Sequence, residues 1–242
     1  IYEKQDETEK ALEAYGIALE YMEQPETLLR RGLIYETQEN LAAALEDYVA
    51  ALQLSPGKAL INQKVVEIYT KLNPNKDSQD FMSDLHTSLD ERRKEEVLSE
   101  VFNIDAPEFQ VTDFNGRSLN NTNMLGKVVF FDFWATWCNP CRRELPEFQA
   151  FYDLYKDDPR VVFVAASTDQ DKQKVQPYID EMKFTFPIAY AGDTATKFGV
   201  EGIPSLFIIG PQGKIRYKIV GFDPDKDFVR EMTWRLESLL DS

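Results

Sequence analysis

Hydrophobic and polar residues follow two different periods along this chain of 242 residues. Up to about residue 100, apolar positions recur every three or four residues with Gly and Pro at the joints, which predicts a series of helices. Beyond Ala106 the apolar positions gather into β-branched and aromatic runs, KVVFFDFWA, RVVFVAAS, SLFIIG and KIRYKIVG, separated by turn signals such as Asn-Gly at 115–116. The pattern predicts an all-helical domain over 1–100 and a mixed α/β domain over 101–242, with the junction near 103–109.

The first half contains residues with the spacing of a tetratricopeptide repeat, a unit of about 34 residues: Leu28, Gly32, Tyr35, Ala44, Tyr48, Ala51 and Pro56. In a repeat of this kind, small residues let two helices approach closely and aromatic residues fill the groove between them. The unit resembles the repeat but departs from it at Leu28, where Trp is usual, and at Arg31, where Leu is usual. A generic helical bundle is the alternative interpretation.

Partial units flank this repeat. Ala11, Tyr15 and Ala18 have the spacing of the second helix of a preceding repeat, and residues 59–73 that of the first helix of a following one. Residues 77–100 predict a last helix, too polar for a core and suited to a cap or spacer. Because the chain opens without Met and already in a helical pattern, we expect a fragment or processed form. Either further repeats precede it, or the helices dock on the second half.

Charge and composition exclude several classes of function. The 42 Asp and Glu residues outnumber the 27 Lys and Arg residues, and most of this negative excess lies within the first 100 residues. Because negative charge repels a phosphate backbone, a nucleic-acid partner is not expected. No apolar run approaches the ~20 residues of a membrane span. The chain has two cysteines and one histidine, His86, which is expected on an exposed helix face. With so few possible ligands we expect no metal site, and two cysteines cannot form a disulfide framework. We also expect no cofactor.

The two cysteines, Cys138 and Cys141, stand where a strand pattern passes into a helical one. A dithiol catalyst needs an exposed thiolate, and a helix N-terminus directs free N–H groups and the positive end of the helix dipole at the first sulfur. Pro140 fits the first turn, where a missing N–H costs nothing. Cys141, one turn further in, is expected to be shielded and to act as the resolving thiol. Two inert buried thiols are the alternative.

The segment DFWATWCNPC resembles the active-site segment of the thioredoxin superfamily, and roughly residues 104–242 resemble its TlpA/ResA-like branch of thiol–disulfide oxidoreductases. CRRELP matches the branch's Cys-x2-Glu-x-Pro continuation, and GVEGIPSLFIIGPQGKI matches its Ile-Pro-Ser/Thr strand and hairpin. The helical stretch 171–187 occupies the place of the branch's central insertion. The resemblance implies an α/β thioredoxin-like fold, with a central mixed sheet and helices on both faces, after an N-terminal all-α tetratricopeptide-like domain.

The resemblance also implies roles for individual residues. Cys138 and Cys141 form the redox couple. Pro204 is expected to be cis, to face the cysteines and to keep a backbone strand open for substrate, with an ordinary loop proline as the alternative. The expected substrate contacts are Trp137, Pro140 and Ile203, whereas Trp134 is expected to pack in the core.

Two acids are candidates for the group that exchanges a proton with Cys141. Asp132, six residues before Cys138 on the buried strand, stands at the place of thioredoxin's buried Asp. Glu144, three residues after Cys141, stands at the place of the branch's buried Glu, with a solvated helix face as the alternative. The branch often lacks an acid at the first of these positions, so the identity of the proton acceptor stays open.

These features predict a thiol–disulfide oxidoreductase that works mainly as a reductant. Strongly oxidising relatives tend to carry a His between the cysteines, whereas this chain has Asn139 and Pro140 there. Expected partners are disulfide-containing protein substrates, a thiol–disulfide donor protein and a possible protein partner on the helical repeats. Because members of the branch mostly work outside the cytoplasm, we expect a periplasmic or membrane-tethered protein that faces outward.

Two other functions fit parts of the sequence. An adaptor would bind partners through the helical repeats and use the thioredoxin-like fold as a docking surface, but intact Cys138, Cys141 and Pro204 argue against a degenerate domain. A peroxidase of the same fold would need a Pro-x3-Thr/Ser-x2-Cys loop, which the sequence lacks. Turnover of a generic disulfide separates the enzyme from the adaptor.

Overall fold

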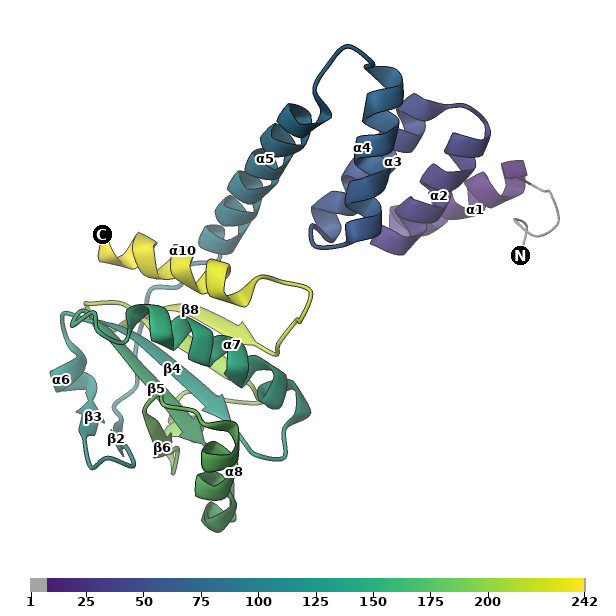
Figure 1. Cartoon of the computed structure of the whole chain (residues 1–242). Helices are drawn as coiled ribbons and strands as arrows, with labels where there is room; N and C mark the ends of the chain where they lie inside the picture. Colours follow the sequence, from purple (N-terminus) through teal and green to yellow (C-terminus); the bar gives the residue numbers. More distant parts are fainter. Residues whose placement is uncertain (1–7, 242) are drawn as a thin grey trace. The chain divides into compact units, whose positions relative to one another are not determined.

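The structure, a computed structural model, describes residues 8–241 (Figure 1). The chain divides into two units, 1–93 and 94–242, here called the helical unit and the α/β unit. The division falls inside helix α5 (Ser78–Ser99), a few residues before the position expected from composition. Leu98, near the end of that helix, packs against the core of the α/β unit. The expectation that the chain opens inside a helix concerns residues 1–7, outside the described residues.

The helical unit is a series of short helices that pair with their neighbours in sequence. Besides α5 they are α1 (Thr8–Tyr21), α2 (Pro25–Thr37), α3 (Leu41–Leu54) and α4 (Ala59–Leu72). The close approach of α2 and α3 depends on Gly32, because a Cβ there would lie 2.6 Å from Cε1 of Tyr48. Tyr48 is fully buried. Gly32 and Tyr48 thus have the packing that the repeat spacing predicts, and α3 ends at Leu54, just before Pro56.

Arg31, at the position where the repeat usually has Leu, forms a bidentate ion pair with Asp47 of α3. Its Nε donates to Oδ2 at 2.9 Å and its Nη2 donates to Oδ1 at 2.7 Å. Asp47 is buried, and a buried carboxylate is costly unless it is paired in this way. Arg31, which departs from the repeat pattern, is therefore compensated by Asp47 on the neighbouring helix, and each neutralises the charge of the other.

Helix α5 contributes side chains to a hydrophobic core, although its composition is mostly polar. Met82 and Leu89 are buried in the core of the helical unit, so the helix is not too polar to contribute to a core; its role as a cap or spacer stays a prediction. These two residues lie two turns apart on one face, and a narrow apolar stripe is enough to bury one side of a polar helix. His86, expected to be exposed, is half-buried, and its Nε2 lies 3.1 Å from Oδ1 of Asn62.

A six-stranded mixed sheet with strand order β1-β8-β7-β4-β5-β6 forms the centre of the α/β unit. Its strands are β1 (Ile104–Asp105), β4 (Val128–Trp134), β5 (Val161–Ser167), β6 (Ile188–Tyr190), β7 (Ser205–Ile209) and β8 (Lys214–Val220). β4, β5 and β6 are parallel, whereas β7 is antiparallel to β4, and β8 is antiparallel to β7 and β1. A separate antiparallel pair consists of β2 (Gln110–Thr112) and β3 (Ser118–Asn120).

Helices cover the sheet and connect its strands. They are α6 (Asn121–Met124), α7 (Asn139–Tyr155), η2 (Lys172–Lys174), α8 (Val175–Met182), α9 (Thr194–Lys197) and α10 (Phe228–Leu240). Figure 1 shows α7 and α10 side by side on one face of the sheet. η2 and α8, within the stretch 171–187 where a helix was predicted, form the crossover from β5 to the parallel strand β6.

Alternation along β4 sends its side chains into two cores. Phe130 and Trp134 belong to the core that includes residues of α7, α8 and α10. Phe131 and Phe133 belong to the core on the other face, which includes residues of β2, β3 and α6. The same alternation places Asp132 on the face covered by α7, so the sheet brings this carboxylate into the layer that also contains the cysteines.

Candidate active site

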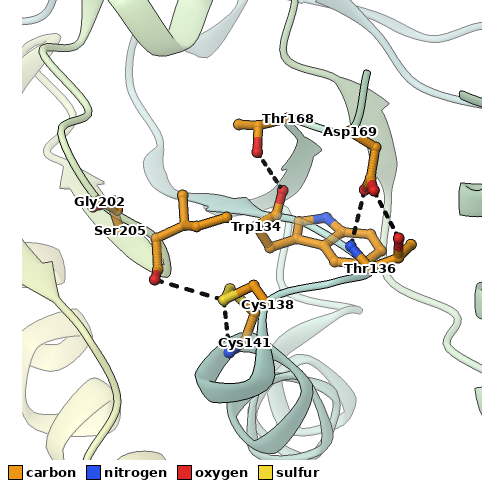
Figure 2. The surroundings of a disulfide bond; sticks show 9 residues. Trp134, Thr136, Cys138, Cys141, Thr168, Asp169, Gly202 and Ser205 are labelled. Atoms are coloured by element: carbon orange, nitrogen blue, oxygen red, sulfur yellow. Dashed lines mark hydrogen bonds between the residues drawn. A yellow bond between two sulfur atoms is a disulfide. The ribbon is translucent and has the colours of Figure 1, made fainter. Parts of the chain in front are cut away.

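Cys138 is the N-cap residue of α7, directly after the turn that follows β4. Its Sγ accepts a hydrogen bond from the backbone N–H of Cys141 at 3.2 Å, and the two cysteines form a disulfide (Figure 2). Pro140 lies in the first helical turn, where the absence of its N–H leaves no bond unmade. The helix start predicted from the sequence is confirmed, and it directs backbone N–H groups at the first sulfur.

The two cysteines differ in their access to solvent. Cys141 is fully buried, and Cys138 is 5% exposed, less than the exposed thiol that the sequence predicted. Trp137, directly before Cys138, is 68% exposed, whereas Trp134 is fully buried. Of the pair, only Cys138 has any exposed surface, and it lies beside a large exposed aromatic side chain.

The loop before β7 lies against Cys138. The peptide bond between Ile203 and Pro204 is cis, as predicted. Sγ of Cys138 lies 3.6 Å from the carbonyl oxygen of Ile203, a contact in which a reduced thiol could donate a hydrogen bond. Pro204 is buried and its carbonyl accepts from the N–H of Gly221 at 2.9 Å, while Ile203 is half-buried. The structure therefore brings this loop and the cysteine pair together.

Asp132 and Glu144 are both buried, with 0% and 1% of their surface exposed, so the solvated-face alternative for Glu144 is wrong. Within residues 8–241, neither carboxylate oxygen of Asp132 has a hydrogen-bond partner, nor has Oε2 of Glu144. Burial raises the pKa of Asp132 from 3.8 to about 8. Burial, together with the negative charge of Asp132, raises the pKa of Glu144 well above its ordinary value of 4.5. Asp132 on β4 and Glu144 on the cysteine-bearing helix α7 are thus two buried carboxyl groups that hold their protons to unusually high pH.

Sequence reasoning missed Asp169, a buried acid two residues beyond β5. Its carboxylate accepts hydrogen bonds from the N–H and hydroxyl of Thr136, in the turn before Cys138, at 2.9 and 2.7 Å. The signal was the tripeptide Ser-Thr-Asp directly after the apolar run VVFVAA. Polar residues at the carboxyl ends of parallel strands gather at one edge of the sheet, where functional groups commonly lie.

Neither a metal centre nor a membrane-spanning helix can be assigned to the part of the chain that the structure describes. In that part, no three His, Cys, Asp or Glu side chains gather so that they could hold a metal ion. None of its helices is both long enough and apolar enough to cross a membrane. The expectation that the chain needs no cofactor stays a prediction.

Comparisons with known proteins agree with this site. The profile of the AhpC/TSA family matches residues 103–218. The thiol–disulfide oxidoreductase ResA of Bacillus cereus (strain ZK / E33L) is 35% identical over 121 residues, which cover 48% of this chain and 68% of the relative. ResA of Geobacillus thermodenitrificans (strain NG80-2) is 32% identical over 129 residues, covering 52% of this chain and 74% of the relative. The chain belongs to the ResA-like thiol–disulfide oxidoreductases.

The α/β unit of this ResA-like chain has a thioredoxin-like fold. A crystal structure from Chlorobium tepidum, of a protein assigned as thiol:disulfide interchange protein DsbE, matches with a TM-score of 0.51 and 29% identity. That match covers 57% of this chain and 96% of the Chlorobium chain. The fold predicted for the second half is therefore confirmed, together with its membership of the thiol–disulfide oxidoreductases. The first half is helical, and its assignment as tetratricopeptide repeats stays a prediction.

Proposed function

We propose that this ResA-like chain reduces disulfides in protein substrates through the couple Cys138–Cys141. One observation carries the proposal. Sγ of Cys138 lies at the N-terminus of α7, where it accepts the N–H of Cys141, while the second sulfur of the disulfide is fully buried. Backbone N–H groups at a helix N-terminus favour the thiolate form of a cysteine, and burial of the second sulfur limits attack to the first.

The exchange proceeds in two steps. The Cys138 thiolate attacks one sulfur of the substrate disulfide, a mixed disulfide forms, and the other substrate sulfur leaves as a thiolate. Cys141 then loses its proton and attacks Sγ of Cys138, so the second substrate sulfur leaves and the chain keeps its own disulfide. Two electrons have then passed to the substrate, and a dithiol donor protein returns the chain to the reduced state.

Asp132 is the proposed acceptor of the Cys141 proton. A thiol has an ordinary pKa of about 8.5, and a general base works best when its pKa lies near the operating pH, where part of it is already deprotonated. The raised pKa of Asp132, about 8, meets this condition. Glu144 is the alternative acceptor, because it lies on the same buried layer one turn after Cys141.

The surface around Cys138 is proposed to bind the substrate chain. Trp137 is exposed next to the attacking sulfur, and Ile203 presents its carbonyl to that sulfur. Pro140 is half-buried in the first turn of α7. Pro204, cis and buried, is proposed to shape the loop against which the substrate lies.

The helical unit is proposed to select protein partners, and the whole chain is proposed to act outside the cytoplasm. The resemblance of α2 and α3 to a tetratricopeptide repeat supports the first part, since such repeats form extended binding surfaces. The absence of cysteines beyond the reacting pair is compatible with an oxidising compartment.

Two experiments test this function. With dithiothreitol as donor, wild-type chain should accelerate reduction of insulin disulfides, and Cys138→Ser should not. Cys141→Ser should accumulate mixed disulfides through Cys138, whereas Cys138→Ser should trap almost none because Cys141 is buried. A chain that binds partners without any mixed disulfide, unaffected by either change, would be an adaptor instead.

The redox potential tests the direction of the reaction. We expect a value of roughly −200 to −270 mV by equilibration with glutathione, closer to thioredoxin than to a strong oxidant. A value near −120 mV would overturn the reducing direction and make the chain an oxidant.

A further inference from the structure

Asp169 lies where β5 ends, and its carboxylate joins two segments of the chain. It accepts three hydrogen bonds from neutral donors: the N–H of Thr136 at 2.9 Å, the hydroxyl of Thr136 at 2.7 Å and the hydroxyl of Ser167 at 2.8 Å. Its side chain is 8% exposed. Figure 2 shows this carboxylate aimed at the turn that leads from β4 to Cys138.

A neighbouring residue adds to the same attachment. The pairing of β4 with β5 ends at Trp134 and Ser167. Just beyond it, Thr168 donates both its N–H, at 2.8 Å, and its hydroxyl, at 3.1 Å, to the carbonyl of Trp134. Hydrogen bonds between the segment after β5 and the segment after β4 thus continue beyond the end of the strand pairing. The bonds between Asp169 and Thr136 are the last of them.

The held turn leads directly to the reacting sulfur. The N–H of Cys138 donates to the carbonyl of Ala135 at 3.1 Å, so the residues on either side of Thr136 form one closed turn. Sγ of Cys138 can accept the N–H of Cys141 only if this turn delivers Cys138 to the N-cap position. Trp137, between the turn and Cys138, is exposed, which leaves Thr136 as the inward attachment point.

We propose that Asp169 is a positioning residue for Cys138, acting through Thr136 to hold the reduced sulfur at the helix N-terminus. The inference rests on the proposed function of the dithiol and adds a residue to it. In the oxidised state the disulfide itself ties Cys138 to Cys141. In the reduced state that bond is gone, and the position of Cys138 depends on the turn and its hydrogen bonds to Asp169.

This difference between the two states gives the proposal a measurable signature. Loss of the Asp169 carboxylate should destabilise the reduced protein more than the oxidised protein. A destabilised reduced state gives up its electrons more readily, so the potential should fall. A residue with a purely structural role would destabilise both states equally and leave the potential unchanged.

The test compares Asp169→Ala with Asp169→Asn in the full chain. Asparagine can still accept the N–H of Thr136 and donate to its hydroxyl, so it removes the charge and retains the attachment. We expect Asp169→Ala to shift the equilibrium constant with glutathione at least about threefold toward the oxidised form, about 15 mV, and to lower the melting temperature of the reduced state most. Asp169→Asn should stay within about twofold of wild type.

Asp171→Asn is the matched control, because Asp171 is an exposed acid in the same loop that accepts a backbone N–H from Gln173. It should leave both readouts unchanged. Equal destabilisation of both redox states by Asp169→Ala, with an equilibrium constant within about twofold of wild type, would overturn the proposal. Equal shifts in Asp169→Asn and Asp169→Ala would also overturn it, since charge and not position would then be responsible.

If Asp169→Ala does not fold, Thr136→Val decides. This substitution removes only the hydroxyl bond and keeps the backbone N–H bond, so the equilibrium constant should shift in the same direction by about two- to threefold relative to the Asp171→Asn control. An unchanged equilibrium constant in Thr136→Val would then overturn the proposal. The potential is measured at equilibrium whether or not the chain turns over a substrate, so failure of wild type to reduce insulin would contradict the proposed function alone.

Discussion

Asp47 in the helical unit and Asp132 in the α/β unit are both buried carboxylates, but they have opposite surroundings. Asp47 accepts two hydrogen bonds from the guanidinium of Arg31. Asp132 lies between apolar strand neighbours, and within residues 8–241 its oxygens have no hydrogen-bond partner. A paired buried charge is compensated locally, whereas an unpaired one must hold a proton and is available to exchange it. Asp47 therefore stabilises the packing of two helices, whereas Asp132 is suited to proton exchange.

The largest expected effect is on the pH dependence of stability. The unfolded chain loses the Asp132 proton near pH 3.8, whereas the folded chain keeps it to about pH 8. Between these values the folded state holds the extra proton, so the free energy of unfolding should fall as pH rises and level off above about pH 8. Asp132→Asn should remove the part of this dependence that Asp132 causes, leaving the part from Glu144, and stabilise the oxidised protein by about 2 to 4 kcal/mol at pH 8. Urea unfolding at pH 4 and pH 8 measures it, and equal wild-type stabilities at both values would contradict a raised pKa.

The next effect concerns the rate of exchange. Asp132→Asn should slow the release of product from the mixed disulfide about 10- to 100-fold at pH 7, because Cys141 loses its proton acceptor. Glu144→Gln is the matched comparison on the same buried layer. Stopped-flow measurement of both variants decides between the acids. A wild-type rate in Asp132→Asn with a slow Glu144→Gln would make Glu144 the acceptor.

In the helical unit, removal of the Arg31 guanidinium that pairs with Asp47 should lower the stability of the chain without changing its disulfide turnover. Arg31→Leu restores the residue usual in the repeat but leaves Asp47 buried without its cation. We expect a loss of about 2 kcal/mol, below the value for a fully buried pair because the Arg31 side chain is 24% exposed. A second change, Asp47→Leu, should recover most of the loss. Denaturant unfolding gives both values, and a concurrent loss of disulfide turnover would break the contrast between the two acids.

A smaller effect tests the packing of α2 on α3. Gly32→Ala should destabilise the helical unit by about 1 to 2 kcal/mol, because the added methyl group meets the ring of Tyr48 at 2.6 Å. Gly16→Ala in α1 is the control, since nothing lies within 4 Å of its added Cβ, and it should stabilise the helix by up to about 1 kcal/mol. Thermal unfolding should therefore move in opposite directions for the two variants. The same sign in both would contradict close approach at Gly32.

The smallest expected effect is on catalysis after removal of residues 1–93. A chain of residues 94–242 should reduce a small disulfide within about twofold of the full chain, because the site lies wholly in the α/β unit. With Cys141→Ser in both backgrounds, the set of trapped proteins should shrink or change on deletion. An unchanged set would mean that substrate choice lies around Trp137 and Pro204, and not in the helices.

The sequence by itself determined the elements and the identity of the dithiol. Hydrophobic period located the buried strands, and the position of Cys138 between a strand pattern and a helical one predicted its N-cap role, because helix starts depend on local residues. The cis bond before Pro204 followed from a family resemblance. These properties depend on short segments of chain, and short segments can be read from sequence.

Only the tertiary structure decided the surroundings of the acids. Whether Glu144 faces solvent or the sheet depends on how α7 rotates onto β4, and helical period leaves that open for a residue beside two arginines. The attachment of Asp169 to Thr136 joins residues 33 positions apart, and only the parallel pairing of β4 with β5 brings them together. The partner of Asp47 likewise depends on the packing of α2 against α3. A local pattern predicts what a segment forms, whereas the energy of a buried charge is set by groups that arrive from elsewhere in the chain.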